Sequence, residues 1–139
     1  MAQDYTETVR AVYKAFGTGD IPYVLSVFDP QIEWNEAENF LYADGNPYIG
    51  PQAILQGVFA HLGADWENFS ATPDEIVGAG DAVVSFGRYR GTFKKTGVAV
   101  NAQFVHVFKF KDGKAIRFQQ YTDTAQFRDA AGLSRSANA

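Results

Sequence analysis

One of the two histidines in this chain lies in a strongly aromatic stretch, and its side chain is the first candidate for chemistry. Phe104, His106 and Phe108 alternate with valines, so an extended chain turns the imidazole to the same side as the phenylalanines. A neutral imidazole on such a face can donate a hydrogen bond to a developing enolate oxygen. The alternative is a core histidine that is bonded to a backbone carbonyl or to water.

Glu36 is the candidate for a catalytic base. Alternation over residues 31–38 predicts a strand with Ile32, Trp34 and Glu36 on one face. If that face is interior, loss of solvation raises the pKa of the carboxyl group toward the range that suits a general base. The alternative is that residues 35–38 have already left the strand, which would make Glu36 a solvated loop acid.

The register of the last predicted hairpin indicates the neighbours of His106. Burial favours pairing of Ile116, Phe118 and Gln120 with the face that carries the imidazole, which makes Gln120 its neighbour. Together with residues from other predicted elements, the expected pocket wall is Tyr13, Trp34, Phe59, Phe104, Phe108 and Gln120.

Two polar residues after this hairpin are further candidates for substrate contacts. They are Tyr121 and Asp123. For Asp123 there is a structural alternative, because Asp123 and Gln126 have the spacing of a helix N-cap and the third helical residue.

The elements that must position these groups begin with helices. Three amphipathic stripes predict them. The first consists of Val9, Val12, Tyr13 and Phe16 and ends at residues 17–20, and the second consists of Ile21, Val24, Leu25 and Phe28 and ends at Pro30. The third begins at Pro51, ends at Gly63 and consists of Ile54, Leu55, Val58, Phe59 and Leu62. Residues 39–50, between the first strand and the third helix, are expected to form a loop.

From Ser70 onward the pattern changes to strands, at about 70–78, 82–93, 98–110 and 115–122. The joints between them carry glycine, which is typical of hairpins. A short helix is expected over residues 123–131. Helices followed by a meander predict an α+β fold, in which helices pack on one face of a curved antiparallel sheet. We expect a single domain over residues 1–139, with its core at about 5–131.

Composition narrows the function classes. The net charge is −4, with twelve acidic and two basic residues in 1–80 and four acidic and ten basic residues in 81–139. The bases are spread over predicted strands, which favours a solvated sheet face over nucleic-acid binding.

There is no cysteine and no apolar run of about 20 residues, which predicts a cytoplasmic protein with no membrane partner. Histidines 45 residues apart do not indicate a metal site, and no cofactor is implied.

Several segments together resemble the nuclear transport factor 2-like superfamily, in its ketosteroid isomerase-related or SnoaL-like branch. They are Gly19-Asp20 after the first helix, Tyr48-Ile49-Gly50-Pro51, residues 87–92, the His106 strand through Asp112-Gly113-Lys114, and residues 120–124. The resemblance covers about residues 5–131. It implies a cystatin-like fold, a cone-shaped, curved, antiparallel or mixed sheet with three N-terminal helices on its concave face.

The resemblance also implies roles for residues. Steroid isomerases of the superfamily have an aspartate base sixteen residues after the Gly-Asp of helix one, and this position is Glu36. Their oxyanion-binding aspartic acid matches His106, and the count for their helix-one tyrosine reaches Val12, next to Tyr13. Polyketide cyclases of the superfamily have an aspartate about fourteen residues after a histidine, where this chain has Gln120.

Two functions remain open. The first is an enzyme without cofactor or metal that transfers a proton next to a carbonyl of a small apolar molecule, in an isomerisation, cyclisation or elimination. The second is a non-catalytic dimeric module that binds a ligand or a partner. In either case the resemblance implies a homodimer through the outer sheet face, with Tyr89, Val105 and Val107 as candidate contacts.

Overall fold

The computed structural model describes residues 4–133. Its elements, in chain order, are α1 (Thr6–Thr18), α2 (Ile21–Val27), β1 (Phe28–Asn35), the 3-10 turn η1 (Ala43–Gly45), β2 (Tyr48–Ile49), α3 (Pro51–Ile54), the π-helical segment η2 (Leu55–Phe59), α4 (Ala60–Asp65), β3 (Trp66–Ala79), β4 (Ala82–Phe93), β5 (Ala99–Lys111), β6 (Lys114–Thr122) and α5 (Thr124–Ala130).

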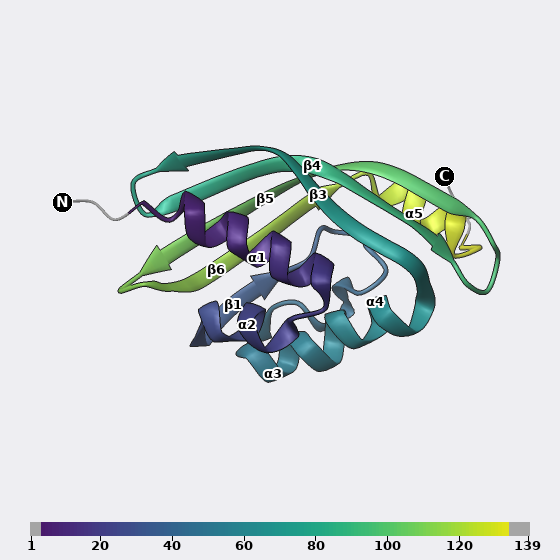
Figure 1. Ribbon diagram of the computed structural model, residues 1–139. Coiled ribbons are helices and arrows are strands. Elements are labelled where there is room, and N and C mark those ends of the chain that lie inside the picture. The colour runs from purple at the N-terminus through teal and green to yellow at the C-terminus, as the bar shows by residue number, and fades with distance from the viewer. Residues whose placement is uncertain (1–3, 134–139) are drawn as a thin grey trace.

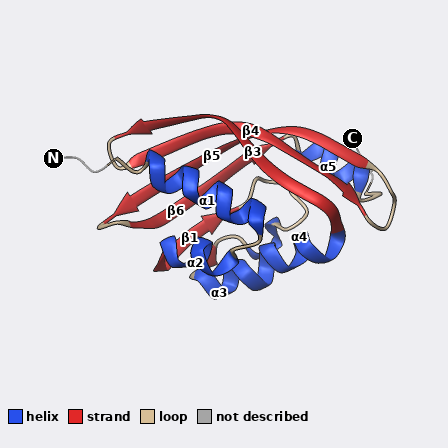
Figure 2. Ribbon diagram, viewed as in Figure 1, coloured by secondary structure: helices blue, strands red, loops and turns tan. Residues whose placement is uncertain are grey.

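The strands form one curved six-stranded sheet in the order β2-β1-β6-β5-β4-β3. Neighbours are antiparallel except β1 and β6, which run parallel, so the sheet is mixed. Helices α1 to α4 lie on one face, and α5 lies near one end of the long strands (Figures 1 and 2). This architecture confirms the predicted α+β fold with N-terminal helices on the concave face of the sheet.

The long hairpins form where the glycine joints predict them. Between β5 and β6, Asp112 and Gly113 have φ angles of 52° and 84°. Both values are left-handed, as a two-residue hairpin turn that follows the sheet twist requires. The predicted start of β3 at residue 70 is wrong, because the strand already begins at Trp66 and its pairing shifts between Glu67 and Ser70. Such an irregularity interrupts the alternation from which strands are predicted.

The first strand differs from its prediction at both ends. Helix α2 ends at Val27, and β1 begins at Phe28 and stops at Asn35. Pairing with β6 decides these ends, since Phe28 lies opposite Ala115 and Asn35 opposite Gln119. Pro30 therefore lies inside the strand, in the irregular stretch where its missing N–H needs no ladder partner.

The predicted loop and third helix are also more finely divided. Within residues 39–50, Tyr48 and Ile49 pair with Trp34 and Glu33 as β2, which is too short to show alternation. The third helix widens into the π-helical segment η2 at Leu55–Phe59 and continues as α4 to Asp65. Gly57 is required here, because a Cβ at this residue would lie 2.2 Å from the Tyr48 ring.

The concave side of the sheet carries the core. Along β4 the side chains of Val83, Ser85 and Tyr89 point inward and are almost fully buried. The prediction that Tyr89 lies on the outer face is wrong. The strand register decides this, because Ser85 is paired with His106 and the inward set of β4 therefore includes every second residue from Ser85.

Helix α5 closes one end of the concave side. Its Phe127 is fully buried and packs edge-on against Phe40, Trp66 and Tyr89, with ring centroids 4.8, 5.5 and 5.7 Å apart. The expected short helix at the end of the chain thus contributes to the core.

Candidate active site

A cavity lies between the helices and the inner face of the sheet. Helices α1 and α2, the η2 and α4 segment and strands β1, β3, β4, β5 and β6 all contribute side chains to its wall. Most of its wall is apolar. The lining residues are Val12, Tyr13, Phe16, Val24, Phe28, Trp34, Glu36, Phe40, Val58, Phe59, Leu62, Phe69, Ala71, Tyr89, His106, Phe108, Phe118 and Gln120.

Glu36 enters this cavity from just beyond the end of β1. Asn46 holds its backbone on both sides, because Glu36 N donates to Asn46 Oδ1 at 2.9 Å and Asn46 Nδ2 donates to the Glu36 carbonyl at 2.8 Å. The side chain is only 3% exposed, and Trp34 Nε1 donates to its Oε2 at 2.9 Å. Glu36 therefore lies beyond the end of the strand, as the alternative interpretation predicted. It is nevertheless a buried acid, whereas that interpretation predicted a solvated one.

Burial dominates the electrostatics of Glu36. Loss of solvation raises the pKa of its carboxyl group to about 8, and the hydrogen bond from Trp34 opposes part of this rise. A carboxyl group with such a pKa exchanges its proton near neutral pH, which is the property that a general acid or base needs.

His106 lies on β5 with both ring nitrogens hydrogen bonded to tyrosines. Tyr13 Oη is 2.6 Å from Nδ1, and Tyr89 Oη is 2.5 Å from Nε2. Burial lowers the pKa of the imidazole to about 3, so the ring is neutral at physiological pH. The expectation that His106 itself donates to a substrate oxygen does not fit this geometry, because a tyrosine hydroxyl group occupies each nitrogen.

These tyrosines extend the contacts of His106 into a buried network. Tyr13 Oη is hydrogen bonded to Ser85 Oγ, and Gln120 Nε2 donates to Tyr89 Oη at 2.8 Å. The backbone N–H of Ala37 donates to Gln120 Oε1 at 3.0 Å. The residue next to Glu36 is thus joined through side chains to His106 and onward to Ser85.

Sequence reasoning missed two members of this network, Ser85 and Tyr89. The signal was present in the alternation of β4, which places both on one face. What was missing was the register of β4 against β5, which puts Ser85 directly opposite His106.

Seven of the predicted site residues line the cavity: Tyr13, Trp34, Glu36, Phe59, His106, Phe108 and Gln120. The predicted register is observed at two pairs, since His106 lies opposite Gln120 and Phe108 opposite Phe118. It is wrong at Ile116, because an irregularity between Lys109 and Phe110 places the buried Ala115 opposite Phe110 instead. Tyr13 reaches the site although the family count points to Val12. Both residues line the cavity, because the buried face of α1 is wide enough to include two adjacent positions.

Three predicted contacts lie elsewhere. Phe104 is 2% exposed and stacks on the His106 ring at 4.0 Å, so it supports the imidazole from outside the cavity wall. Tyr121 and Asp123 border a separate groove with Phe86 on the outer face of the sheet. Successive side chains of a strand point to opposite faces. Because Gln120 points inward, the side chain of Tyr121 points outward.

Asp123 immediately precedes α5, as the structural alternative held. Its carboxylate does not cap the helix backbone; it accepts a hydrogen bond at 3.0 Å from Gln126 Nε2. Gln126 Oε1 in turn accepts from the backbone N–H of Asn101. Asp123 and Gln126 therefore fasten α5 to β5.

Within residues 4–133, no three His, Cys, Asp or Glu side chains gather closely enough to hold a metal ion, and no helix is long and apolar enough to cross a membrane. The polar groups at the cavity are instead one carboxyl group and a cluster of neutral donors and acceptors. Such an arrangement can move a proton at one point and stabilise negative charge on an oxygen at another.

Comparison with known proteins agrees with this fold. An NTF2-like protein from Burkholderia thailandensis has a TM-score of 0.88 and 31% identity, covering 93% of this chain and 98% of that chain. An NTF2-like protein of unknown function from Burkholderia pseudomallei has a TM-score of 0.83 and 28% identity, covering 92% of this chain and 98% of that chain. TerC, co-crystallised with polyporic acid, has a TM-score of 0.79 and 30% identity, with 91% and 96% covered.

No functionally curated protein matches the sequence at a significant level. The family model of the SnoaL-like domain matches residues 9–118, which is most of the chain. The mixed curved sheet, the helices on its concave face and these structural relatives agree with that match. The chain therefore belongs to the SnoaL-like domain family, within the nuclear transport factor 2-like superfamily.

Proposed function

We propose that this protein is an enzyme that moves a proton next to a carbonyl group of a small, mostly apolar molecule. Ionised Glu36 takes a proton from the carbon beside the carbonyl. The electron pair of that C–H bond forms the carbon–carbon double bond of the enolate, and the π pair of the carbonyl group moves to its oxygen. The resulting enolate is stabilised by hydrogen bonds from the polar cluster around His106. Protonated Glu36 then returns the proton to another carbon, which completes an isomerisation. In a cyclisation the enolate carbon attacks a second carbonyl carbon of the same molecule, and Glu36 gives its proton to the oxygen of that carbonyl. In an elimination the enolate expels a leaving group from the next carbon, and Glu36 gives its proton to that group.

The observation that carries this proposal is the environment of Glu36. Its carboxyl group is buried at an apolar cavity, and its one hydrogen bond among the described residues comes from the Trp34 side chain. Burying a carboxyl group without a cation beside it costs free energy, so a purely structural residue at this place would be expected to be apolar. Tyr13, Tyr89 and Gln120 supply hydrogen-bonding groups to the same cavity.

The cavity wall supports the choice of substrate class. Its aromatic and aliphatic side chains favour a flat or compact apolar body, and its few polar groups favour a carbonyl or enol oxygen. TerC was co-crystallised with the small molecule polyporic acid, which makes this compound a first probe for the present chain. A thermal-shift screen of polyporic acid and of apolar ketones and enones identifies ligands, because binding to the folded state raises the midpoint.

The test of the reaction is Glu36→Gln, assayed on a compound that the screen identifies and the wild type converts. Gln keeps the shape of the side chain but cannot take a proton. We expect turnover to fall by about 10²–10⁴-fold with ligand affinity retained, the usual contribution of a positioned acid or base. Glu38→Gln is the matched control, since Glu38 is a neighbouring but exposed carboxylate.

The same variants distinguish the enzyme from the non-catalytic alternative. Full activity in Glu36→Gln rejects Glu36 as the base. Hydrogen–deuterium exchange at the carbon beside the carbonyl is measured in D₂O for compounds that bind to the wild type. If the protein does not raise the exchange rate above the rate without protein, the result favours a binding module. Exchange that is lost in Glu36→Gln and kept in Glu38→Gln supports the proposed proton transfer.

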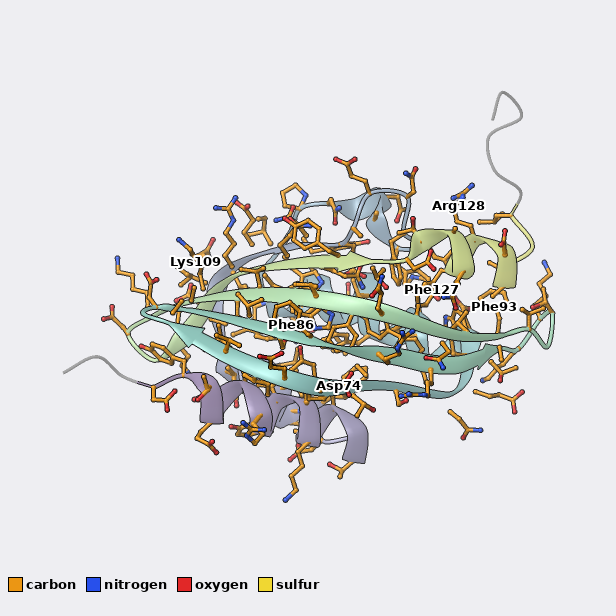
Figure 3. All side chains as sticks on the ribbon, turned by 90° about the horizontal axis from the view of Figure 1, so that it is seen from above. Asp74, Phe86, Phe93, Lys109, Phe127 and Arg128 are labelled. Atoms are coloured by element: carbon orange, nitrogen blue, oxygen red, sulfur yellow. The ribbon has the colours of Figure 1, made fainter. Side chains whose placement is uncertain are left out.

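We further propose that the protein forms a homodimer through the outer face of its sheet, as the family resemblance implies. Phe86, Val105 and Tyr121 lie opposite one another on β4, β5 and β6 and form a row on this face. Phe86 and Tyr121 are 41% and 56% exposed, although both are large and apolar. Figure 3 looks onto this face and shows Phe86 near the middle of the sheet. The row replaces Tyr89, which points inward, as the expected contact.

A further inference from the structure

The direction of the hydrogen bonds around His106 can be worked out from one end of the network. The backbone N–H of Ala37 can only donate, so the end of the Gln120 amide that it meets is the oxygen Oε1. The other end, Nε2, therefore faces Tyr89 Oη and donates to it. Tyr89 accepts this hydrogen bond whatever the state of the imidazole.

Two arrangements remain for a neutral His106. In the first, Nε2 carries the proton and donates to Tyr89, while Tyr13 donates to Nδ1 and Ser85 donates to Tyr13. In the second, Nδ1 carries the proton and donates to Tyr13, Tyr13 donates to Ser85, and Tyr89 donates to Nε2. Each arrangement uses the same contacts and leaves one hydroxyl proton without an acceptor.

The two arrangements differ in where that unused proton lies. In the second it belongs to Ser85, which is fully buried, lies outside the cavity wall and has Tyr13 as its one hydrogen-bond partner among residues 4–133. A buried donor without an acceptor is costly. In the first it belongs to Tyr89, which lines the cavity and can give its proton to water or to a ligand. The first arrangement is therefore favoured.

We infer that the Tyr89 hydroxyl group is the hydrogen-bond donor that this cavity presents to an acceptor oxygen of its ligand. Gln120 and the Nε2–H of His106 both donate to Tyr89 Oη, which directs its own proton away from them. His106 is then a positioning residue, and Tyr89 is the group that touches the ligand. The inference rests on the proposed function in one respect, namely that the ligand oxygen is the carbonyl that becomes an enolate.

The first test needs no ligand. The chain has only two histidines, His61 and His106, so ¹⁵N-histidine labelling gives two sets of side-chain signals, and His61→Gln assigns them. We expect His106 to be protonated at Nε2 and unprotonated at Nδ1 at neutral pH. Protonation at Nδ1 would overturn the inference, because Tyr89 would then give its proton to His106.

The second test uses acetophenone labelled with ¹³C at its carbonyl as the probe. It is done at pH 9, where Glu36 is mostly ionised and cannot donate. We expect the bound carbonyl resonance to move downfield in the wild type, and we expect Tyr89→Phe to abolish this shift and weaken binding about tenfold, as the loss of one hydrogen bond predicts. Tyr42→Phe is the matched control, because Tyr42 is a buried tyrosine outside the cavity wall.

The outcomes separate this inference from the proposed function. An unchanged carbonyl shift in Tyr89→Phe overturns Tyr89 as the donor but leaves Glu36 as the base. Full activity in Glu36→Gln overturns the proton transfer but leaves the carbonyl shift of the wild type as evidence for the donor. If acetophenone does not bind, the protonation state of His106 still decides the inference.

Discussion

Trp34 and Glu36 show how two neighbouring residues set the chemistry of this cavity. Burial raises the pKa of the Glu36 carboxyl group to about 8, and the indole N–H of Trp34 stabilises the ionised form. With this pKa, only a minor fraction of Glu36 is ionised at pH 7. If Glu36 is the base, kcat/KM of the wild type should rise with pH and level off above about 8.

We predict that Trp34→Phe raises the pKa of Glu36 further, because it removes the indole hydrogen bond that favours the carboxylate. The pH profile of kcat/KM should move to higher pH, and activity at pH 7 should fall. A ¹³C NMR titration of the glutamate side chains measures the pKa directly and needs no substrate.

Phe118→Leu is the control for lost packing around the indole. Phe118 stacks on Trp34 with ring centroids 3.7 Å apart, so this variant disturbs the stack and leaves the indole N–H in place. Equal shifts of the Glu36 pKa in the two variants would show that packing, and not the hydrogen bond, controls the carboxyl group.

At the scale of elements, the two faces of the sheet carry different sets of side chains. Along β4, Ser85 and Tyr89 point to the inner face of the sheet, and Phe86 points to the outer face. This division follows from the alternation of side chains in a strand together with the register of β4 against β5. A change on the outer face should therefore affect association and leave the cavity intact.

We predict that the wild type is a dimer at micromolar concentration and that Phe86→Glu is a monomer that keeps its ligand affinity. A carboxylate in the middle of an apolar contact would lose its solvation on association. Sedimentation velocity and light scattering measure the mass. Tyr23→Glu is the control, since Tyr23 is a similarly exposed aromatic residue on α2, on the helical side of the sheet (38% exposed).

A wild type that stays monomeric at this concentration would contradict the proposed dimer. The same holds if Tyr23→Glu dissociates the dimer and Phe86→Glu does not.

At the scale of the whole molecule, Glu36 and His106 act on the pH dependence of stability in opposite directions. Burial lowers the pKa of His106 from 6.5 to about 3, so the unfolded chain binds more protons and stability falls as the pH drops from 6.5 to 3. Burial raises the pKa of Glu36 from 4.5 to about 8, so the folded protein binds more protons and stability falls as the pH rises from 4.5 to 8.

We predict a plateau of stability between about pH 4.5 and 6.5, where the two effects cancel, with a decline on either side. Each group alone contributes a slope of about 1.4 kcal/mol per pH unit. Urea unfolding from pH 3 to 9 measures the free energy of unfolding. Glu36→Gln should remove the decline between pH 6.5 and 8, and Glu38→Gln should keep it; a decline that persists in Glu36→Gln would refute the assignment.

Local sequence patterns determined most of the helices and strands of this protein. The spacing of apolar residues predicted the N-terminal helices, and the Asp112-Gly113 turn and the alternation of β5 predicted the last hairpin with Gln120 opposite His106. These features follow from periods of two or about 3.6 residues and from the conformations that glycine adopts, so they can be read from neighbours in the chain. The family motifs added the overall fold.

Only the tertiary structure decided how the polar groups are connected. The register of β4 against β5 brought Ser85 and Tyr89 to the inner face, and Asn46, ten residues along the chain, held Glu36 at the cavity after its strand had ended. Contacts between residues distant in sequence depend on the pairing of whole strands, and the pKa of a carboxyl group depends on the burial that such pairing creates, so neither property is encoded in a local pattern.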